Sequence, residues 1–178
     1  MDELQARIHG EHPFRTPPEL REPVRRLRGR LASPVTIWTS GGEGAYTGLT
    51  VSSALVVEGE TSSIFGLVGP LTDLWDALEA TRTFVVHVLP ATEKTLADRF
   101  AGLRPSPGGL FADANVSASK WGPVLADLPD RVYCRVTGWT EPGFQRLVAG
   151  AIERIEMEEL DDPLVYFRGR YRQLASDD

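Results

Sequence analysis

The chain is nearly free of cysteine: Cys134 is the one example among 178 residues. A single cysteine cannot form an internal disulfide, which favours a reducing compartment, and the alternation of VYCRV predicts that Cys134 is a small buried residue. Long apolar runs are also missing, so no segment reaches the roughly 20 residues that cross a bilayer. Because the N-terminus is acidic and has no apolar signal core, we expect a cytoplasmic protein without membrane contacts.

An excess of basic residues is absent as well. Lys and Arg number 19 against 25 Asp and Glu, which gives a net charge of −6 and argues against nucleic acid as a partner. Hydrophobic residues make up 42% of the sequence, enough for one folded domain with a core. We expect residues 1–22, which are polar and contain several prolines, to form an N-terminal arm and residues 23–178 to form this single domain.

Common nucleotide, nucleophile and metal motifs are missing too. In SGGEGAYTG, Thr47 stands where a dinucleotide fingerprint needs its third glycine, so we interpret residues 40–44 as a hairpin turn. No P-loop, nucleophile elbow or metal-ligand spacing occurs, and we predict no metal site. His87 shares a strand face with Val85 and Leu89, which favours a core histidine over a catalytic one.

What the sequence does contain is mainly strands. The alternation and β-branched residues of PVTIWTS and AYTGLTV predict a hairpin, and later segments repeat this pattern. Strands are expected within residues 34–40, 45–51, 53–57, 62–69, 84–90, 130–139, 146–157 and 161–174, with a long loop at 103–122. Because strands and helices do not alternate regularly, we exclude a doubly wound parallel sheet and expect a closed antiparallel barrel, which removes exposed edges.

A short helix is expected before the strands. In residues 21–33, Val24, Leu27 and Leu31 recur at helical spacing with arginines between them. This spacing predicts an amphipathic helix whose basic face is solvated. A phosphate or nucleic-acid contact on that face is the minor alternative.

Two further helices are expected among the strands. Thr72 is a good N-cap for the first of them, and acidic residues follow in its first turn. The second is expected to begin at Thr92 and to end at Gly102. The apolar stripe predicted for the first helix is Leu71, Leu74, Trp75 and Leu78.

Three short segments carry groups that a ligand could use. TVSS (residues 50–53) places hydroxyls before an apolar strand. GPLTDLW (69–75) opens a helix, where free N–H groups and the helix dipole favour an anion. DRFAG (98–102) places an arginine beside a turn of small residues. Each segment alone is weak evidence, because hydroxyls at helix ends are usually structural caps.

In this order the three segments resemble the flavin reductase-like family, which has an FMN-binding split barrel. GLTVSS matches the family segment Gly/Ala-Met/Leu-Thr-x-Ser-Ser, LADRFAG its Arg/Lys-Phe-Ala-Gly turn, and DPLVYFRGRYRQL its C-terminal Tyr-x-x-Gly-x-Tyr strand. The resemblance covers residues 26–174. It implies a mainly β (α+β) fold, an antiparallel split β-barrel with short flanking helices, and a homodimer with the flavin near the subunit interface.

The resemblance also implies which residues hold the flavin. Backbone N–H groups and short hydroxyls suit the polar edge of the ring, whereas the phosphate requires N–H donors and a cation. The implied contacts are Thr50, Val51, Ser52 and Ser53 for the ring, and Gly69, Pro70, Leu71, Thr72, Arg99, Phe100, Ala101 and Gly102 for the phosphate side. Tyr171 is a further implied contact, and Arg168 is a weaker candidate near the interface.

The activity implied by the resemblance is NAD(P)H-dependent flavin reduction. Hydride passes from the reduced nicotinamide to FMN, and the flavin rather than a side chain carries the chemistry. The protein is a candidate reductase component of a two-component monooxygenase, its partner through diffusing reduced flavin. FAD in place of FMN, and a barrel of the same shape that uses a deazaflavin or haem, are the open alternatives for the cofactor.

Two departures from the family concern the nicotinamide. Many reductases of this type carry Gly-Asp-His before the long strand, with the histidine associated with the nicotinamide, whereas this chain reads Gly143-Phe144-Gln145. A common family asparagine is His87 here. Gln145 and His87 are therefore candidate nicotinamide-side positions, and no certain catalytic residue is predicted. The alternative function is a flavin-binding protein without reductase turnover, in a storage, sensing or accessory role.

Overall fold

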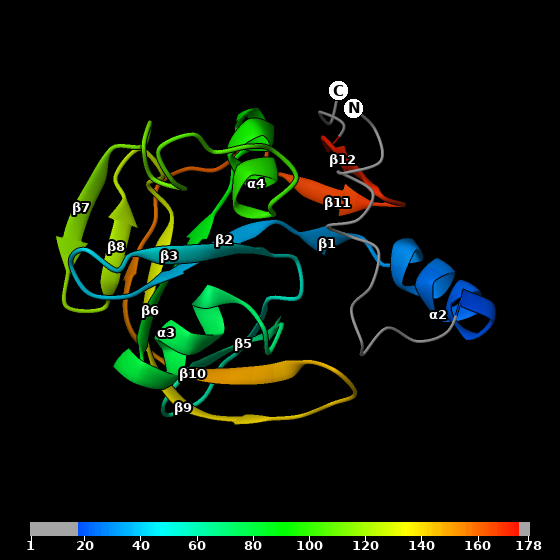
Figure 1. Cartoon of the computed structure of the whole chain (residues 1–178), viewed down its shortest axis with the longest axis horizontal. Coiled ribbons are helices and arrows are strands. Elements are labelled where there is room, and N and C mark those ends of the chain that lie inside the picture. The colour runs from blue at the N-terminus through cyan, green and yellow to red at the C-terminus, as the bar shows by residue number, and fades with distance from the viewer. Residues whose placement is uncertain (1–17, 175–178) are drawn as a thin grey trace.

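Seven strands form one antiparallel sheet in the computed structural model, which describes residues 18–174 (Figure 1). Their order across the sheet is β3-β2-β6-β9-β10-β5-β4. The bounds are β2 Thr36–Ser40, β3 Thr47–Val51, β4 Leu55–Val57, β5 Ser63–Val68, β6 Thr83–Val88, β9 Arg131–Thr140 and β10 Arg146–Glu156. The predicted mainly β fold and the hairpin between β2 and β3 are confirmed.

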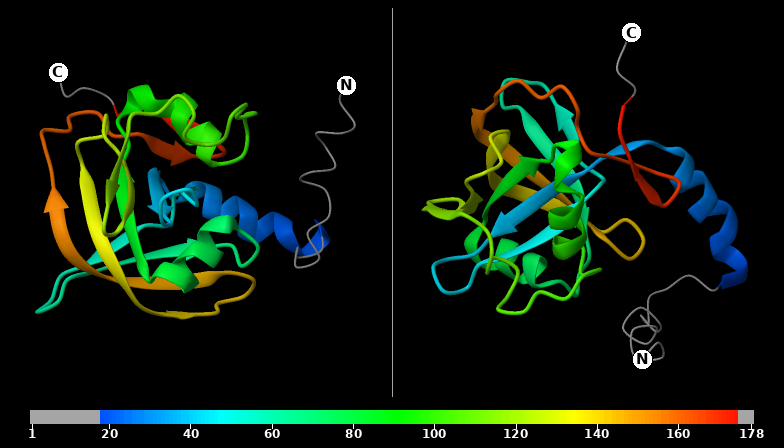
Figure 2. Two further views of the ribbon diagram at one scale, coloured as in Figure 1. Left: turned by 60° about the vertical axis from the view of Figure 1, so that its left-hand side comes forward. Right: turned by 90° about the horizontal axis from the view of Figure 1, so that it is seen from above.

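The sheet curls until its two ends face each other across a packed interior (Figure 2). Trp38 of β2 stacks on Phe84 of β6 with ring centroids 4.7 Å apart, and both side chains are fully buried. A Cβ on Gly66 of β5 would lie 2.6 Å from the Trp38 ring and 3.3 Å from Val51 of β3. Glycine at position 66 therefore lets β5 approach β2 and β3 from the opposite wall. The predicted burial of Cys134 is confirmed, and burial raises the pKa of its thiol to about 12.

Helix α3 (Asp73–Thr81) covers one end of this interior. Its N-cap is Thr72, as predicted, because the Thr72 side chain accepts a hydrogen bond from the Trp75 backbone N–H. Leu74, Trp75 and Leu78 are buried against the core. The predicted apolar stripe is wrong at Leu71, whose side chain is 67% exposed because it precedes the cap and lies outside the helix.

Helix α4 (Lys94–Phe100) follows a 3-10 turn, η1 (Ala91–Glu93). The N-caps of these elements are Pro90 and Glu93, and neither makes a side-chain cap hydrogen bond. The prediction that Thr92 caps this helix is therefore wrong. Gly102 ends the helical segment with a φ of 70°, as predicted. Phe100 is 2% exposed and packs in the core.

A hairpin of β7 (Val116–Ser119) and β8 (Gly122–Leu125) occupies part of the segment predicted to be a loop. Every residue of β8 is buried. Thr39 of β2 donates a side-chain hydrogen bond of 2.6 Å to the Pro123 carbonyl, which ties β8 to the barrel wall. The loop prediction for residues 103–122 is wrong at this hairpin, because the hairpin is stabilised by contacts distant in sequence.

The C-terminal segment forms a small separate sheet with order β1-β11-β12. Its strands are β1 Ser33–Pro34, β11 Val165–Phe167 and β12 Arg170–Arg172, so the last predicted strand is a strand pair. In Figure 1 this sheet lies beside α4. Tyr171 of β12 donates a hydrogen bond to Asp98 of α4, so this small sheet is attached to the helix that carries Arg99.

Helix α2 (Pro18–Arg30) projects away from the barrel (Figure 1). It begins before residue 21, so the predicted arm boundary at residue 22 falls inside the helix, while residues 1–17 lie outside the described residues. Its predicted apolar stripe is exposed at Val24 and Leu27, which are 69% and 62% exposed, while Leu31, 63% exposed, lies just beyond the end of the helix at Arg30. No helix within residues 18–174 is both long and apolar enough to cross a bilayer.

Candidate functional site

The end of β3 lies between helix α4 and the end of β5. Thr50 Oγ1 donates a hydrogen bond of 2.7 Å to the Ala97 carbonyl in α4. Ser53 Oγ accepts a hydrogen bond of 2.8 Å from the backbone N–H of Leu67, near the end of β5. Since α4 carries Arg99 and β5 leads into the turn at residues 69–72, the three segments singled out in the sequence meet around residues 50–53.

Residues 50–53 divide into supporting and accessible positions. The Val51 side chain is 2% exposed and belongs to the core, and its carbonyl accepts a hydrogen bond of 2.6 Å from Thr36. The Thr50 hydroxyl proton is used on α4. Ser52 is exposed, and Ser53 uses its oxygen as an acceptor, so its hydroxyl proton is free to be donated. The side chains available to a ligand are therefore Ser52 and Ser53.

The turn at residues 69–72 makes several hydrogen bonds of its own, which engage the Gly69 carbonyl and the Thr72 hydroxyl. The Gly69 carbonyl accepts from the Thr72 backbone N–H at 3.3 Å and from the Thr72 hydroxyl at 2.8 Å. The same hydroxyl accepts from Trp75, so it acts as a structural cap. Asp73 and Asp76 place carboxylates in the first turn of α3, which favours the helix dipole but opposes a bound anion. Half-buried Pro70 and exposed Leu71 add no charge, so this turn is the weaker of the two predicted phosphate positions.

The end of α4 supplies a cation beside an open turn. Arg99 is 20% exposed at its side chain, and its Nη2 atom lies 3.6 Å from Oδ2 of Asp113. The Phe100 side chain is buried, so only its backbone could reach a ligand. Half-buried Ala101 leads to Gly102, where no atom lies within 4 Å of the position that a Cβ would occupy. This end of α4 therefore offers a guanidinium and open space beside Gly102, while the backbone N–H groups of Ala101 and Gly102 donate to the Ala97 and Arg99 carbonyls within the turn.

Tyr171 supports α4 rather than facing outward. Its hydroxyl donates a hydrogen bond of 2.9 Å to Asp98 Oδ1, and burial together with this bond raises the pKa of Tyr171. Arg104 lies 3.5 Å from the second oxygen of Asp98. Arg168 has a positive φ of 52° in the turn between β11 and β12, and its backbone N–H donates to Gly29 of α2. These two C-terminal candidates therefore hold helices in place.

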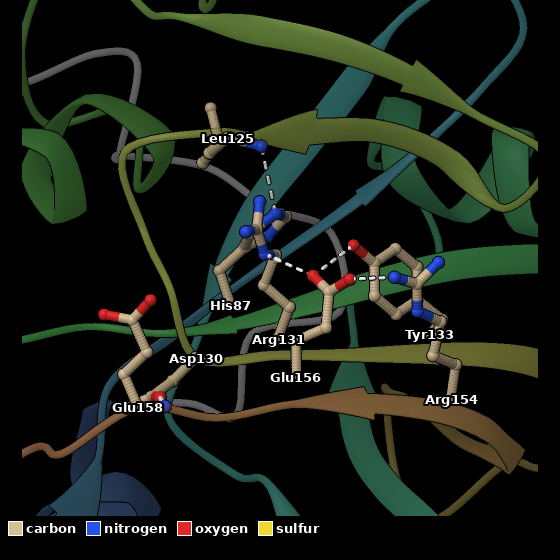
Figure 3. Close-up of polar contacts among 8 residues, drawn as sticks. All are labelled: His87, Leu125, Asp130, Arg131, Tyr133, Arg154, Glu156 and Glu158. Carbon is tan, nitrogen blue, oxygen red and sulfur yellow. Dashed lines mark hydrogen bonds and ion pairs between the residues drawn. The ribbon is translucent and has the colours of Figure 1, made fainter.

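His87 is a core residue, as the strand pattern favoured (Figure 3). Its Nε2 atom accepts a hydrogen bond of 3.0 Å from the Leu125 backbone N–H, and its Nδ1 atom lies 3.2 Å from the Ile37 carbonyl, so the proton resides on Nδ1. Burial, with a smaller contribution from Arg131, lowers the pKa of His87 to about 4. A nicotinamide-side role for His87 is wrong, because the ring is fully buried and both of its nitrogens are engaged.

Comparison with known proteins assigns the family. The model of the flavin reductase like domain matches residues 28–175 of this chain. The chain belongs to this family. Two curated relatives are each 28% identical over 156 residues: FMN reductase (NADH) RutF 1 of Methylorubrum extorquens and the reductase component of 4-hydroxyphenylacetate 3-monooxygenase of Thermus thermophilus. The first match covers 84% of this chain and 75% of the relative, and the second covers 88% and 98%.

Solved structures place this flavin reductase-like chain in the same fold. Flavin reductase PheA2 superposes with a TM-score of 0.79 and 25% sequence identity, covering 90% of this chain and all of that chain. The NADH:FAD oxidoreductase SgcE6 of Streptomyces globisporus superposes with a TM-score of 0.81 and 24% identity, covering 92% and 98%. The predicted split-barrel architecture is thus confirmed.

The donor groups around the end of β3 fit the flavin that this family name implies. A ring edge with several acceptors requires small donors that do not crowd it, and Ser52, Ser53 and the neighbouring backbone provide them. A phosphate requires a cation, and Arg99 is held weakly enough by Asp113 to provide one. The described residues contain no group of His, Cys, Asp and Glu side chains suited to a metal ion.

Gln145 lies beside the turn at residues 69–72. Its Oε1 atom is 4.0 Å from the position that a Cβ on Gly69 would occupy, and its side chain is exposed. Arg146, which the sequence reasoning missed, has its guanidinium 5.4 Å from the ring centroid of Trp75 and 3.2 Å from Glu141. The signal that could have found it is its position directly after Gln145, at the start of β10.

An open depression elsewhere on the described surface is not part of this site. It has a volume of about 520 Å³ and lies between the β4–β5 turn and the far part of β10. Its lining residues are Glu60, Thr61, Ser62, Ile152, Glu153, Arg154 and Ile155. None of them belongs to the three segments that meet at the end of β3, so we assign the candidate flavin site to those segments and not to this hollow.

Proposed function

We propose that this chain binds FMN at the end of β3 and catalyses hydride transfer to it from NAD(P)H. The observation that carries the proposal is the pair of hydrogen bonds from Thr50 to Ala97 and from Leu67 to Ser53. These bonds hold a small, polar segment between a cation-bearing helix and the end of β5, within a fold whose family is defined by flavin reductases.

Each side chain has a stated task in this proposal. Ser52, Ser53 and the neighbouring backbone N–H groups bind the polar edge of the ring, and Arg99 balances the phosphate charge. Tyr171 fixes α4, and with it Arg99, through its hydrogen bond to Asp98. The flavin supplies the hydride-accepting chemistry when bound, while the protein supplies binding and orientation. FAD can use the same contacts, since its isoalloxazine ring and first phosphate are those of FMN.

The second substrate is placed on the side of Gln145. Its amide lies beside Gly69, and an amide can both donate to and accept from the carboxamide of a nicotinamide. The neighbouring Arg146 adds a positive charge at the start of β10. We place NADH or NADPH there, with its nicotinamide against the open face of the ring.

We further propose that reduced flavin leaves for a separate flavin-dependent monooxygenase. The support is the Thermus thermophilus relative, which is named as the reductase component of a monooxygenase. A cytoplasmic location accords with this role and with a single cysteine, which cannot form an internal disulfide.

A homodimer is the proposed assembly. Two apolar surfaces of the chain are exposed. One consists of Val24 and Leu27 on α2 with Leu31 just after the helix, and the other is a sheet face at β4 and β5 that includes Leu55 and Leu67. Exposed apolar side chains that gather in this way are typical of protein–protein interfaces. Light scattering coupled to gel filtration should give twice the mass of 19.6 kDa, and a single-chain mass would contradict the dimer.

A second candidate function is flavin binding without turnover, in a storage, sensing or accessory role. The observation that favours it is the stretch Gly143-Phe144-Gln145, which places no titratable group beside Gly69. The two functions are separated by following the absorbance of NADH and NADPH with FMN-loaded protein under air. Catalytic oxidation supports the reductase, whereas bound flavin with unchanged nucleotide absorbance supports the second candidate.

A further inference from the structure

Arg99 lies mostly inside the molecule but faces a carboxylate from a surface loop. Its side chain is 20% exposed, whereas the side chain of Asp113 is 80% exposed. The Nη2–Oδ2 distance of 3.6 Å is longer than a charge-assisted hydrogen bond, which measures about 2.7–2.9 Å. Within residues 18–174, Asp113 is the one ionic partner of Arg99. The pair is therefore long, exposed on one side and weak.

The loop that carries Asp113 is tethered close to it. The Phe111 ring lies 5.2 Å from that of Phe100 and 6.0 Å from that of Tyr46, measured between centroids. The Ala114 backbone N–H donates a hydrogen bond of 3.1 Å to the Phe111 carbonyl, so residues 111–114 form a tight turn. Asp113 is thus held near Arg99 by its neighbours and not by the ion pair itself.

The other carboxylate next to Arg99 along the chain is committed elsewhere. Asp98 accepts the Tyr171 hydroxyl at 2.9 Å and pairs with Arg104 at 3.5 Å. If the Asp98 side chain turned away, the hydrogen bond that joins α4 to β12 would be lost. If the Asp113 side chain turns away from Arg99, none of the hydrogen bonds that hold α4 is broken. Asp113 is therefore the anion that can leave Arg99 at little cost to the fold.

We infer that Asp113 competes with the flavin phosphate for Arg99 and thereby sets how tightly phosphate-bearing flavins are held; the inference rests on the proposed function. A carboxylate and a phosphate require the same guanidinium donors. Asp113 swings into solvent, where it is already mostly exposed, when the phosphate reaches Arg99. Riboflavin has no phosphate, so its affinity does not depend on Asp113.

The test measures Kd for FMN and for riboflavin by quenching of flavin fluorescence in the full-length protein. The variants are Asp113→Asn, Arg99→Gln and the double variant, with Asp161→Asn as the matched control that removes an exposed carboxylate elsewhere. Asp113→Asn should tighten FMN binding by about 2- to 5-fold, the range of an exposed ion pair, and leave riboflavin unchanged. Arg99→Gln should weaken FMN by about 10-fold or more and abolish the effect of Asp113→Asn.

Three results overturn the inference. They are unchanged FMN affinity in Asp113→Asn, equal tightening of FMN and riboflavin, and equal tightening in Asp161→Asn, which would indicate a general charge effect. If the unaltered protein binds neither flavin, the proposed function fails and the inference with it. If it binds FMN and oxidises NADH while Asp113→Asn has no effect, the inference alone fails.

Discussion

The hydroxyl of Tyr171 donates a hydrogen bond of 2.9 Å to Asp98, across 73 positions of sequence. This bond joins β12 to α4, the helix that carries Arg99, so the C-terminal strand contributes to the candidate site by holding it in place. We therefore expect Tyr171→Phe to loosen the attachment of α4 to β12. A hydrogen bond to a charged group contributes about 1.5–3 kcal/mol, and the free energy of unfolding should fall by about this amount.

FMN affinity in Tyr171→Phe should fall by only a few-fold, because Arg99 remains present. Tyr166→Phe is the matched control, since Tyr166 lies next to Tyr171 with ring centroids 5.6 Å apart and makes no side-chain hydrogen bond within residues 18–174. Urea unfolding and FMN titration measure the two effects. Equal stability of both variants would show that the bond to Asp98 does not hold α4.

His87 predicts a pH dependence of stability. Its folded-state pKa of about 4 lies below the ordinary value of 6.5, so the neutral ring is the form that the fold requires. The contribution of His87 to the free energy of unfolding is fully present well above pH 6.5, because the ring is then neutral in both the folded and the unfolded chain. As the pH falls from 6.5 to 4, the unfolded chain takes up the proton first, and stability falls by about 1.4 kcal/mol per unit, about 3 kcal/mol in all.

The window of pH 5.5–6.5 isolates this contribution best. The pKa values of Glu153 and Glu156 are lowered from 4.5 in the folded chain, so the folded and unfolded chains differ in the protonation of these two groups mainly below this window. His87→Asn removes the titrating ring, and its free energy of unfolding should vary less with pH across the window than that of the unaltered protein. Urea unfolding at four pH values measures both slopes, and identical slopes would contradict the assignment.

Ser53→Trp tests where the ring lies. The indole would fill the space beside the hydroxyl that accepts from Leu67, so FMN binding should weaken by roughly 100-fold or more. Thr61→Trp is the control, since Thr61 is exposed at the remote depression. Gel filtration should give the same oligomeric state for both variants. FMN affinity that survives Ser53→Trp would place the ring elsewhere.

Phe144 and Gln145 are predicted to limit the use of the reduced nucleotide. The double variant Phe144→Asp with Gln145→His places a charge and a titratable ring beside Gly69. We expect kcat/KM for NADH to rise by about 10-fold and to acquire a pH dependence near 6.5, while Kd for FMN changes less than about 2-fold. Steady-state kinetics from pH 5.5 to 8 measure this. An unchanged profile would show that the hairpin does not contact the nucleotide.

Local chemistry was enough to predict much of the fold. The β2–β3 hairpin followed from alternation around a glycine turn, and the Thr72 cap followed from a hydroxyl before an apolar stripe. The predicted cap at Thr92 failed because the start of α4 is set at long range. The Ala91 backbone N–H donates to the Asp162 carbonyl at 2.8 Å, and the chain then enters α4 through a 3-10 turn.

The sequence predicted which segments form the candidate site, but not which of their polar side chains support the fold and which are available to a ligand. Thr50 and Ser53 look alike in the sequence, yet one hydroxyl holds α4 and the other accepts from β5. Nothing in the sequence around Asp113 points to the site, because its role depends on its contact with Arg99, 14 positions earlier in the chain. Partners that meet only in the folded chain decide which polar residues bind a ligand and which support the fold.

The central claim, that the end of β3 binds a phosphate-bearing flavin, is tested most directly by titrating the purified protein with FMN. Visible absorbance and flavin fluorescence should reveal saturable binding with a Kd in the micromolar range or tighter, about −8 kcal/mol or more favourable. The flavin bands should shift as the ring leaves water. A colourless protein that neither quenches nor shifts FMN at saturating concentration would contradict the account.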